Sequence, residues 1–373
     1  MKVLILGGTG AMGAHLVKFL EGKVTAIFVT SRTKHSDSEK IMYLHGNARD
    51  IGFLTEILKK FWDVIIDFMS YGTDEFKSRR DLLLGATSQY VFFSSARVYS
   101  KSEVPITEET PRLLDVSTDQ VYLKTDEYAL AKARQENLLY DSGRRNWTVI
   151  RPSITFSETR LQLGVLEKES WLYRALHGRS IVFSEDIADK LTAMTYGWDV
   201  SKGIASIVGN PKAYGKIFHI TSKEAFRWHE ILEIYLEVLE KILGTRPKVV
   251  MTKKSLNLRI SKYQVIYCRY FNRRFDNSKI KQFVDVDAFR KTEDGLRYCL
   301  EKFLKNPSFF NINWTLEAMN DRAAGERTPL SEIPSLKSRV FYVIERLHLS
   351  FVLRVLRKGY HFFVRNYLLG FVK

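Results

Sequence analysis

A tyrosine and a lysine stand four residues apart in the segment DEYALAKARQENLLY, at Tyr128 and Lys132. On a helix this spacing puts both side chains on one face. A tyrosine titrates at about pH 10, so it exchanges a proton near neutral pH only with help, and a nearby ammonium lowers the pKa of a phenol. We interpret Tyr128 as a general acid/base, and Lys132 as the group that tunes it and reaches a ribose. An ordinary exposed pair is the alternative, because this spacing also arises by chance.

Three glycines with G-x-x-G-x-x-G spacing lie near the start of the chain. Residues 3–6 before them are typical of a buried strand, and residues 12–20 have helical spacing, so we predict a strand, a turn and a helix. In such a unit the glycines allow backbone to approach a pyrophosphate, which the helix N-terminus faces. The turn therefore predicts a dinucleotide site, with a tight turn lacking a ligand as the alternative. The expected contacts are Gly7, Thr9, Gly10, Ala11, Met12 and Gly13.

Apolar runs alternate with helical patterns through the first half of the chain. The predicted strands are 24–30, 41–44, 64–68, 90–93 and 147–150, and a helix is predicted at 51–61. Alternation of this kind predicts an α/β fold with a Rossmann-type, doubly wound parallel sheet. A later strand is predicted at 217–221 and a helix at 229–243.

The alternation lapses beyond about residue 153, which predicts a change of domain. We predict an NAD(P)-binding Rossmann domain at 1–152, to which some later segments return, and a smaller C-terminal substrate lobe at 153–305. The polar stretch 306–336 is interpreted as a linker or surface wrap, and 337–373 as a basic amphipathic helical tail.

The tail holds eight basic residues against one acidic residue. On a helix, the cations of one face are Arg339, Arg346, Arg354, Arg357, Lys358 and Arg365, and the residues opposite are Leu349, Val352, Leu356, Tyr360, Phe363 and Tyr367. This pattern is typical of an interfacial helix on an anionic membrane. Packing on protein through the apolar face is an equal alternative.

The order of the motifs carries more information than any one of them. The glycine turn is followed by YVFFSSARVY, then YALAK, then WTVIRPS. Over roughly residues 1–300 this order resembles the extended short-chain dehydrogenase/reductase superfamily, in particular the NAD-dependent epimerase/dehydratase family. The resemblance implies that Ser95 hydrogen-bonds the reacting hydroxyl, with Ser94 as the fallback. It also implies that Tyr128 exchanges the hydroxyl proton while hydride moves between a sugar carbon and the nicotinamide, and that Lys132 holds the ribose.

The residues after Ser95 differ from one branch of that family. Its 4,6-dehydratases follow their catalytic threonine with Asp-Glu, whereas Ala96 and Arg97 stand here. Elimination of water by that route is therefore not expected. Epimerisation of a nucleotide sugar or reduction of a keto-sugar remains, and the resemblance implies a role in polysaccharide or glycoconjugate biosynthesis. We expect Arg97 to face solvent, with contact to a substrate phosphate or carboxylate as the alternative.

The cofactor is selected after the second strand, where Thr30, Ser31 and Arg32 occur without a carboxylate. An acidic residue there binds the ribose 2′-OH of NAD, whereas an arginine accommodates a 2′-phosphate. The stretch favours NADP(H) and leaves NAD(H) open; Arg32 stacking on adenine or facing solvent is the alternative. The other cofactor contacts that the resemblance implies are Asn47, Ala48, Phe68, Met69, Ser70, Tyr128, Lys132 and Pro152.

The net charge of +16 implies an anionic partner. A nucleotide sugar and an anionic membrane surface fit this charge, a nucleic acid is not favoured, and a homodimer is left open. The two cysteines, Cys268 and Cys299, predict neither a disulfide framework nor a metal site. No signal peptide is recognisable, so we expect a cytoplasmic protein, peripheral at the inner membrane face if the tail binds lipid.

Two other functions compete with the sugar-nucleotide enzyme. One is a non-catalytic Rossmann protein that senses a dinucleotide or binds RNA, which the basic charge permits. The other is an NADPH-dependent reductase of a carbonyl compound that is not a sugar. Retention of Ser95, Tyr128 and Lys132 together argues against the first, and the long second lobe argues against the second.

Overall fold

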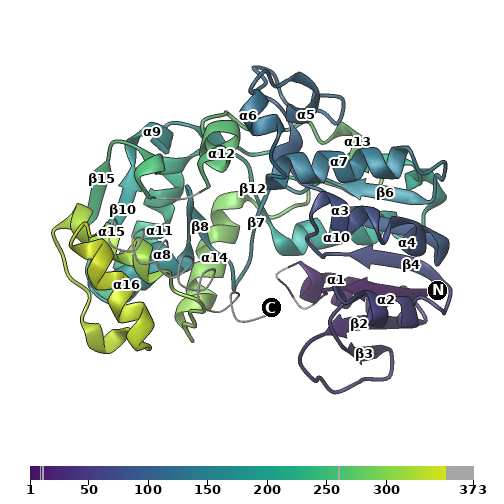
Figure 1. The fold of residues 1–373 in the computed structure, drawn as a ribbon, viewed down its shortest axis with the longest axis horizontal. Coiled ribbons are helices and arrows are strands. Elements are labelled where there is room, and N and C mark those ends of the chain that lie inside the picture. The colour runs from purple at the N-terminus through teal and green to yellow at the C-terminus, as the bar shows by residue number, and fades with distance from the viewer. Residues whose placement is uncertain (9, 11, 259–260, 350–373) are drawn as a thin grey trace, which may run out of the picture. The chain divides into compact units, whose positions relative to one another are not determined.

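A computed structural model describes residues 1–8, 10, 12–258 and 261–349 of the chain (Figure 1). The chain divides into two compact units, and each is built from separate segments. The first unit comprises Met1–Leu161, Ala188–Val238 and Tyr263–Asn306, and the second comprises Gln162–Ile187, Leu239–Lys262 and Pro307–Lys373. This division differs from the predicted boundaries at 152 and 305, because the second unit is assembled from three parts of the sequence.

Seven strands form a parallel sheet in the first unit, in the order β13-β6-β5-β4-β1-β2-β3. Their bounds are β1 (Lys2–Leu6), β2 (Ala26–Ser31), β3 (Ile41–His45), β4 (Trp62–Asp67), β5 (Thr87–Phe93), β6 (Trp147–Ile150) and β13 (Lys216–Phe218). The predicted Rossmann-type parallel sheet is thereby confirmed. The strand order reverses beside β1, and ligands of open α/β sheets bind outside the carboxyl ends of strands at such a point.

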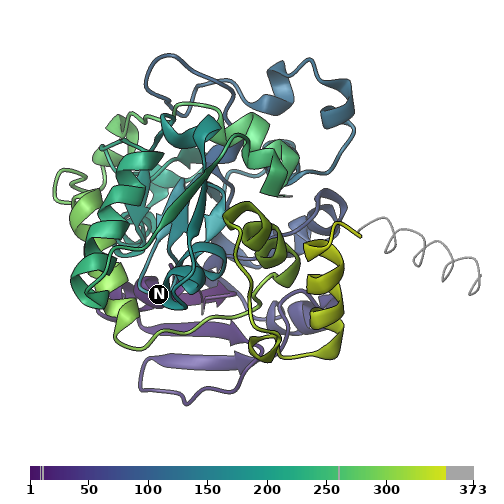
Figure 2. The same ribbon diagram turned by 90° about the vertical axis from the view of Figure 1, so that its left-hand side faces the viewer.

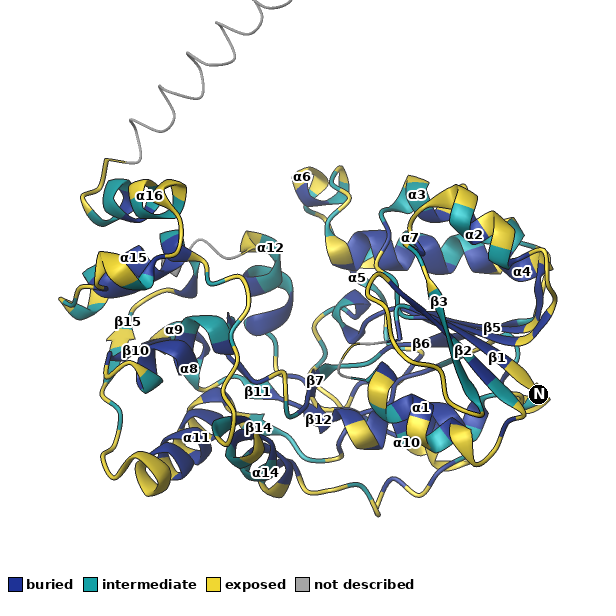
Figure 3. Cartoon of the chain, turned by 90° about the horizontal axis from the view of Figure 1, so that it is seen from below, coloured by how far each residue is buried: buried dark blue, intermediate teal, exposed yellow. Residues whose placement is uncertain are grey.

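Helices cover both faces of this sheet, whose strands are buried between them (Figure 3). The helices are α1 (Gly13–Glu21) and α10 (Gly197–Ile207) on one face, and α2 (Ile51–Ile57), α3 (Thr73–Lys77), α4 (Arg80–Gly85) and α7 (Tyr128–Tyr140) on the other. Strand β1 shows why both faces are apolar. Its Val3 packs in the cluster that contains Leu16 of α1, and its Leu4 packs in the cluster that contains Leu54 of α2.

Further helices and short strands complete the first unit. They are α5 (Leu113–Val116), α6 (Gln120–Leu123), β7 (Ile154–Phe156), β11 (Leu191–Thr192), β12 (Met194–Tyr196), β14 (Phe226–Arg227), α11 (Trp228–Leu243), α12 (Lys262–Gln264), α13 (Ser278–Lys281) and α14 (Thr292–Leu304). The last residues of α11 and the first residue of α12 belong to the second unit. A π-helix at Val265–Arg269 and a 3-10 helix, η1, at Ala96–Val98 lie in the first unit.

The second unit is built around two parallel strands, β10 and β15. Its elements are β8 (Gln162–Leu163), β9 (Leu166–Glu167), α8 (Lys168–Leu176), β10 (Ile181–Ser184), α9 (Glu185–Ala188, ending in the first unit), β15 (Val249–Thr252), α15 (Trp314–Ala324) and α16 (Leu336–Arg346). Figures 1 and 2 show α15 and α16 side by side.

Helix α15 lies inside the stretch 306–336 that we predicted as a linker or wrap, so this prediction needs correction. Trp314 and Ala318 of the helix are buried in a small apolar cluster. Its polar residues Glu317 and Asp321 are buried as well, because both pair with the fully buried Arg174. Polar residues that suggested a surface segment therefore lie in the interior of the second unit.

Only the beginning of the basic tail, up to residue 349, is described. There α16 buries Tyr342 and Glu345 within the second unit, and Arg339 and Arg346 donate hydrogen bonds to backbone carbonyls. This part of the tail packs on protein, the alternative that the sequence left open. Residues 350–373, with most of the predicted membrane-facing residues, lie outside the described part. In the described ranges, no helix has both the length and the apolar character needed to cross a membrane.

Candidate functional site

The carboxyl ends of adjacent strands bring most of the predicted site residues to one edge of the sheet. Leu6 at the end of β1 pairs with Asp67 at the end of β4, and Asp67 pairs with Phe92 in β5. The glycine turn, the segment 68–70 and the two serines after β5 therefore follow neighbouring strands. This is the edge at which a doubly wound sheet binds its ligand.

The glycine turn has the geometry of a phosphate-binding loop. Gly7 has a φ of +72°, and its N–H donates to Thr30 Oγ1 over 3.0 Å. A Cβ on Gly13 would lie 2.2 Å from the carbonyl oxygen of Gly8, so only glycine lets α1 approach the turn. Gly10 is exposed, and a Cβ there would have no atom within 4 Å. Among the described residues, no side chain caps the N-terminus of α1 at Met12. The Ala14 N–H donates to the carbonyl of Gly10, and the other N–H groups of the first turn are suited to an anion.

Two predicted contacts, Thr9 and Ala11, lie outside the described residues. The segment after β4 contacts the turn, because a Cβ on Gly7 would lie 2.8 Å from the sulfur of Met69. The ring of Phe68 lies 4.2 Å from that of Phe93, measured between centroids. These contacts place Phe68 and Met69 between the glycine turn and the end of β5.

The adenine-side residues come together through an arginine that the sequence did not single out. Asn47 is exposed and accepts a hydrogen bond from the Arg49 N–H, and Ala48 between them is buried. The guanidinium of Arg49 donates to the carbonyl of Ser70 over 2.8 Å. Arg32 follows β2 directly and is exposed, which leaves its guanidinium accessible to a ligand.

Ser95 and Tyr128 lie together at the end of β5. Ser95 is 8% exposed, and its hydroxyl lies near enough to the phenol of Tyr128 to lower the pKa of that phenol. Although 39% of Tyr128 is exposed, loss of water around the phenol raises its pKa above 10. Arg97, Ser95 and Arg160 act in the opposite direction, and Lys132 is not among the groups with the largest effect on this pKa. Among these charged groups, Arg97 lowers the pKa of Tyr128 most, and tuning by Lys132 stays a prediction.

Lys132 lies one helical turn after Tyr128 and is 2% exposed. Its Nζ lies 4.7 Å from the centroid of the Phe92 ring and makes no hydrogen bond to the described residues. Burial lowers its pKa to about 8, against the charges of Asp67 and Glu136. A buried ammonium with free donors is suited to a ligand hydroxyl, so the lysine fits the ribose role better than the tuning role.

The sequence reasoning missed a buried set of charges behind the site. Glu136 is fully buried on α7 and accepts from Ser94 Oγ over 2.6 Å and from Arg151 over 2.7 and 2.8 Å. Ser94, the fallback for Ser95, therefore points into this network. Arg151 precedes Pro152, whose carbonyl accepts from the Ala96 N–H. Glu136 stands four residues after Lys132 on the same helix, but a charged residue is interpreted as exposed unless its partner is known.

Asp67 is the second charged group that the sequence reasoning missed. It ends an apolar strand, is fully buried, and accepts a hydrogen bond of 2.8 Å from the Tyr90 hydroxyl. Burial raises its pKa to about 6, opposed mainly by that hydrogen bond and also by the charge of Lys132. A buried carboxyl group thus lies at the end of β4, near enough to the Lys132 ammonium for the two charges to interact.

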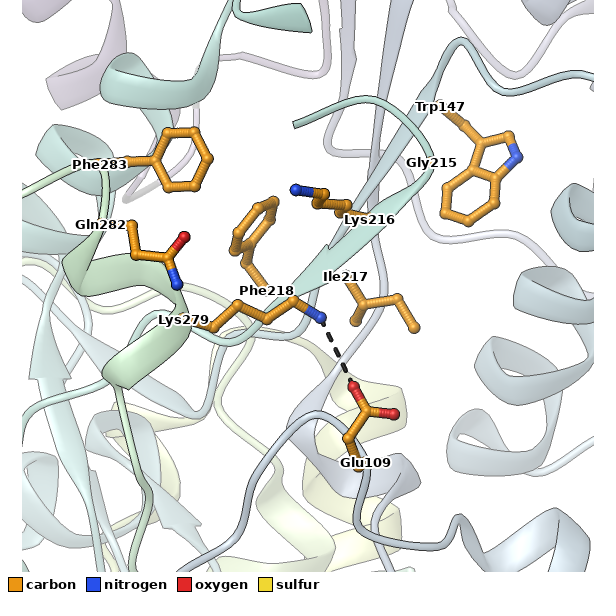
Figure 4. Close-up of a pocket in the computed structure, with 9 residues that line it drawn as sticks. All are labelled: Glu109, Trp147, Gly215, Lys216, Ile217, Phe218, Lys279, Gln282 and Phe283. Carbon is orange, nitrogen blue, oxygen red and sulfur yellow. Dashed lines mark ion pairs between the residues drawn. The ribbon is translucent and has the colours of Figure 1, made fainter. Parts of the chain in front are cut away.

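A pocket of about 350 Å³ lies elsewhere in the first unit, beside the edge strand β13 (Figure 4). It is lined by Trp147, Phe218 and Phe283 among others, and Lys279 pairs there with Glu109 at 3.7 Å. None of the predicted site residues lines this pocket, so it is separate from the carboxyl-end site.

Comparison with known proteins decides the family. The model of the NAD dependent epimerase/dehydratase family matches residues 3–213, more than half of the chain. The chain belongs to this family. The resemblance read from the motifs is confirmed, and with it the interpretation as an enzyme of the extended short-chain dehydrogenase/reductase type. No curated protein matches the sequence significantly.

Solved structures of this family share the fold at low sequence identity. Pal from Bacillus thuringiensis is 16% identical with a TM-score of 0.64, covering 82% of this chain and 99% of Pal. UDP-glucuronic acid 4-epimerase from Bacillus cereus, in complex with UDP-glucuronic acid and NAD, is 16% identical with a TM-score of 0.60, covering 82% and 99%. The NAD complex of dTDP-glucose 4,6-dehydratase from Bacillus anthracis is 17% identical with a TM-score of 0.59, covering 82% and 97%.

Proposed function

We propose that this protein is an NAD(P)-dependent sugar-nucleotide epimerase or keto-sugar reductase of polysaccharide or glycoconjugate biosynthesis. The observation that carries the proposal is the placement of Ser95 beside the phenol of Tyr128 at the carboxyl end of β5. The glycine turn and the buried ammonium of Lys132, which makes no hydrogen bond within the described part of the chain, fit a nicotinamide dinucleotide beside this pair. The UDP-glucuronic acid and NAD bound to the Bacillus cereus epimerase support a nucleotide sugar as substrate.

Each of the three side chains has a role that its surroundings allow. Ser95 holds the reacting hydroxyl by a hydrogen bond, and Tyr128 accepts or returns the proton of that hydroxyl. Lys132 donates to the cofactor ribose from its buried position. The dinucleotide supplies a hydride acceptor and donor when bound. With Ala96 and Arg97 after Ser95, no carboxyl group stands there to eliminate water, so epimerisation or reduction is favoured over dehydration.

The first experiment identifies the nucleotide that the purified protein releases on denaturation, and then titrates the emptied protein with NADH and NADPH. Retained NAD or NADP supports an epimerase, because an epimerase regenerates its cofactor internally. An empty site that binds NADPH supports a keto-sugar reductase. Failure to bind either dinucleotide contradicts the proposal and favours the non-catalytic alternative.

A substitution at Gly10 separates ligand binding from folding. The added methyl group of Gly10→Ala meets no protein atom within 4 Å, so the free energy of unfolding is expected to stay within about 1 kcal/mol of wild type. The same methyl group blocks approach of a pyrophosphate to the backbone, so we expect dinucleotide affinity to fall at least about tenfold. Gly22→Ala, also in open space but at the other end of α1, is the matched control. Equal affinities of both variants and wild type would argue against a pyrophosphate at the turn.

Arg32 tests the preference for NADP(H). We expect Arg32→Ala to weaken NADPH binding about tenfold and to leave NADH binding nearly unchanged, because a hydrogen bond to a charged group contributes roughly 1.5–3 kcal/mol. Fluorescence titration of each cofactor measures both affinities. Lys34→Ala removes another exposed cation two residues later and is the control. A parallel loss of NADH and NADPH affinity would mean that Arg32 contacts the adenine instead.

A further inference from the structure

Arg97 occupies a position against the reacting side chain that the sequence did not predict. It is the second residue of η1, and its side chain is 18% exposed. Its guanidinium carbon lies 5.1 Å from the centroid of the Tyr128 ring. The expectation that Arg97 faces solvent is therefore wrong, and a fixed positive charge lies over the face of the phenol.

Glu127 holds the guanidinium in this place. One carboxylate oxygen accepts a short hydrogen bond from Arg97 Nη2. The other oxygen caps α7 by accepting from the Ala129 N–H over 2.8 Å, and accepts from the Tyr122 hydroxyl over 3.3 Å. Glu127 is itself only 10% exposed, so the ion pair is shielded from water and from salt. The N-terminus of α7, on which Tyr128 is the first residue, therefore fixes the arginine and the tyrosine together.

Arg97 is also coupled to Ser95. The Arg97 backbone N–H donates to Ser95 Oγ over 3.2 Å, which leaves the serine hydroxyl hydrogen free to be donated elsewhere. Ser95, Arg97, Glu127 and Tyr128 thus form one connected group. The ammonium of Lys132 lies against the ring of Phe92 and makes no hydrogen bond to this group.

We propose that Arg97, held in place by Glu127, is a positioning residue for the proposed reaction. Its guanidinium orients Tyr128 toward Ser95 and stabilises the phenolate formed when Tyr128 gives up its proton. This inference rests on the proposed function for its catalytic consequence. In this proposal Arg97 stabilises the Tyr128 phenolate and Lys132 binds only the cofactor ribose, whereas the sequence indicates both roles for Lys132.

Charges on the neighbouring elements agree with this assignment. The groups that face Tyr128 are Arg97 on η1, Arg160 after β7, and Glu127 on its own helix. Among the groups that lower the pKa of Tyr128, Arg97 has the largest effect, and Glu127 raises that pKa. Arg160 is exposed, so water and salt weaken its effect relative to that of the shielded Arg97.

The test measures the ionisation of Tyr128 directly, as the difference in tyrosinate absorbance between each protein and the same protein carrying Tyr128→Phe. We expect Arg97→Met to raise the pKa of Tyr128 by about one unit or more, and Arg97→Lys, which keeps the charge, to restore most of the shift. Lys132→Met is expected to move this pKa less than Arg97→Met does. Turnover of a nucleotide sugar near neutral pH should fall about tenfold in Arg97→Met, with its pH profile displaced to higher pH and NAD(H) affinity unchanged.

Two results would overturn the inference. One is an unchanged Tyr128 pKa in Arg97→Met, and the other is a loss of turnover that is the same at every pH. If Arg97→Met does not fold, the pKa of Tyr128 is compared in Arg97→Lys and Lys132→Met. The inference is also overturned if these two variants shift that pKa from the wild-type value by the same amount. Tyrosinate absorbance needs no substrate, so it tests the role of Arg97 even if the wild-type protein turns over no nucleotide sugar. Absence of turnover in the wild-type protein counts against the proposed function alone.

Discussion

Replacing Tyr128 by phenylalanine is expected to lower turnover of a nucleotide sugar by about 10²–10⁴-fold, the usual contribution of a general acid/base. The substitution removes one hydroxyl group and leaves the ring that Arg97 covers. Dinucleotide affinity is expected to stay at the wild-type value, because the glycine turn and Lys132 are untouched. The measurement combines chromatography of sugar-nucleotide products with titration of NADH and NADPH.

A matched control lies at the other end of the same helix. Tyr140→Phe removes a hydroxyl whose hydrogen bond to Glu136 is 3.4 Å long, and turnover should remain within a few-fold of wild type. Equal loss of turnover in both variants would indicate a general disturbance of α7. Full turnover in Tyr128→Phe would remove Tyr128 from the proposed mechanism and leave a dinucleotide-sensing protein as the better explanation.

The sheet could be predicted from the sequence because local signals agree with the fold. Apolar runs of four to seven residues, separated by turns and helical patterns, correspond to buried strands, and β6 was predicted with its observed bounds, Trp147–Ile150. The glycine turn was predictable for a related reason, since Gly7 has a positive φ and a Cβ at Gly13 would collide with Gly8. These positions depend on near neighbours in the sequence, which pattern reading detects.

The second unit could not be predicted, because its organisation depends on distant pairing. Strands β10 and β15 pair between Ile181 and Val249, and the stretch between those residues includes one segment of the first unit, Ala188–Val238. Helix α15 has good local signals, with Asn313 capping its N-terminus and Gly325 in the left-handed conformation after its end. The helix was not predicted because its acidic residues suggested an exposed segment. Their burial depends on ion pairs with Arg174, which is far away in the sequence.

The candidate site was predictable in its residue types but not in its electrostatics. Spacing placed Tyr128 and Lys132 on one helix, and the motif order added Ser95. Which cation lies against the phenol depends on side-chain directions after β5, and the structure shows Arg97 there. Burial of Glu136 and Asp67 was equally invisible, since a charged residue is read as exposed unless its partner is known.

Removing the carboxylate of Glu136 is expected to cause the largest loss of stability in the first unit. In Glu136→Leu the guanidinium of Arg151, itself 2% exposed, loses both hydrogen bonds to its counterion. Breaking a buried ion pair by removing one partner costs about 3–5 kcal/mol, because the remaining charge stays buried without compensation. Urea and thermal unfolding of the full chain measure this loss.

The double variant distinguishes the ion pair from simple loss of packing. If the buried charge of Arg151 causes the loss, Glu136→Leu together with Arg151→Met should recover part of the stability, and the two effects should not add. Glu293→Gln, which breaks the exposed pair with Arg297, is the control and should cost at most about 1 kcal/mol. Additive effects of the two buried substitutions would mean that each side chain contributes through packing alone.

The same substitution also reaches the site through Lys132. The negative charges of Asp67 and Glu136 support the protonated state of the lysine, whose pKa burial has already lowered to about 8. Without Glu136 the pKa of Lys132 is expected to fall toward neutral pH, so a larger share of the lysine loses the positive charge that strengthens its hydrogen bond to a ribose. Glu136→Gln, which keeps the shape of the side chain, should therefore weaken dinucleotide binding more at pH 8 than at pH 6. Equal weakening at both pH values would show that Glu136 acts on the fold and not on the charge of Lys132.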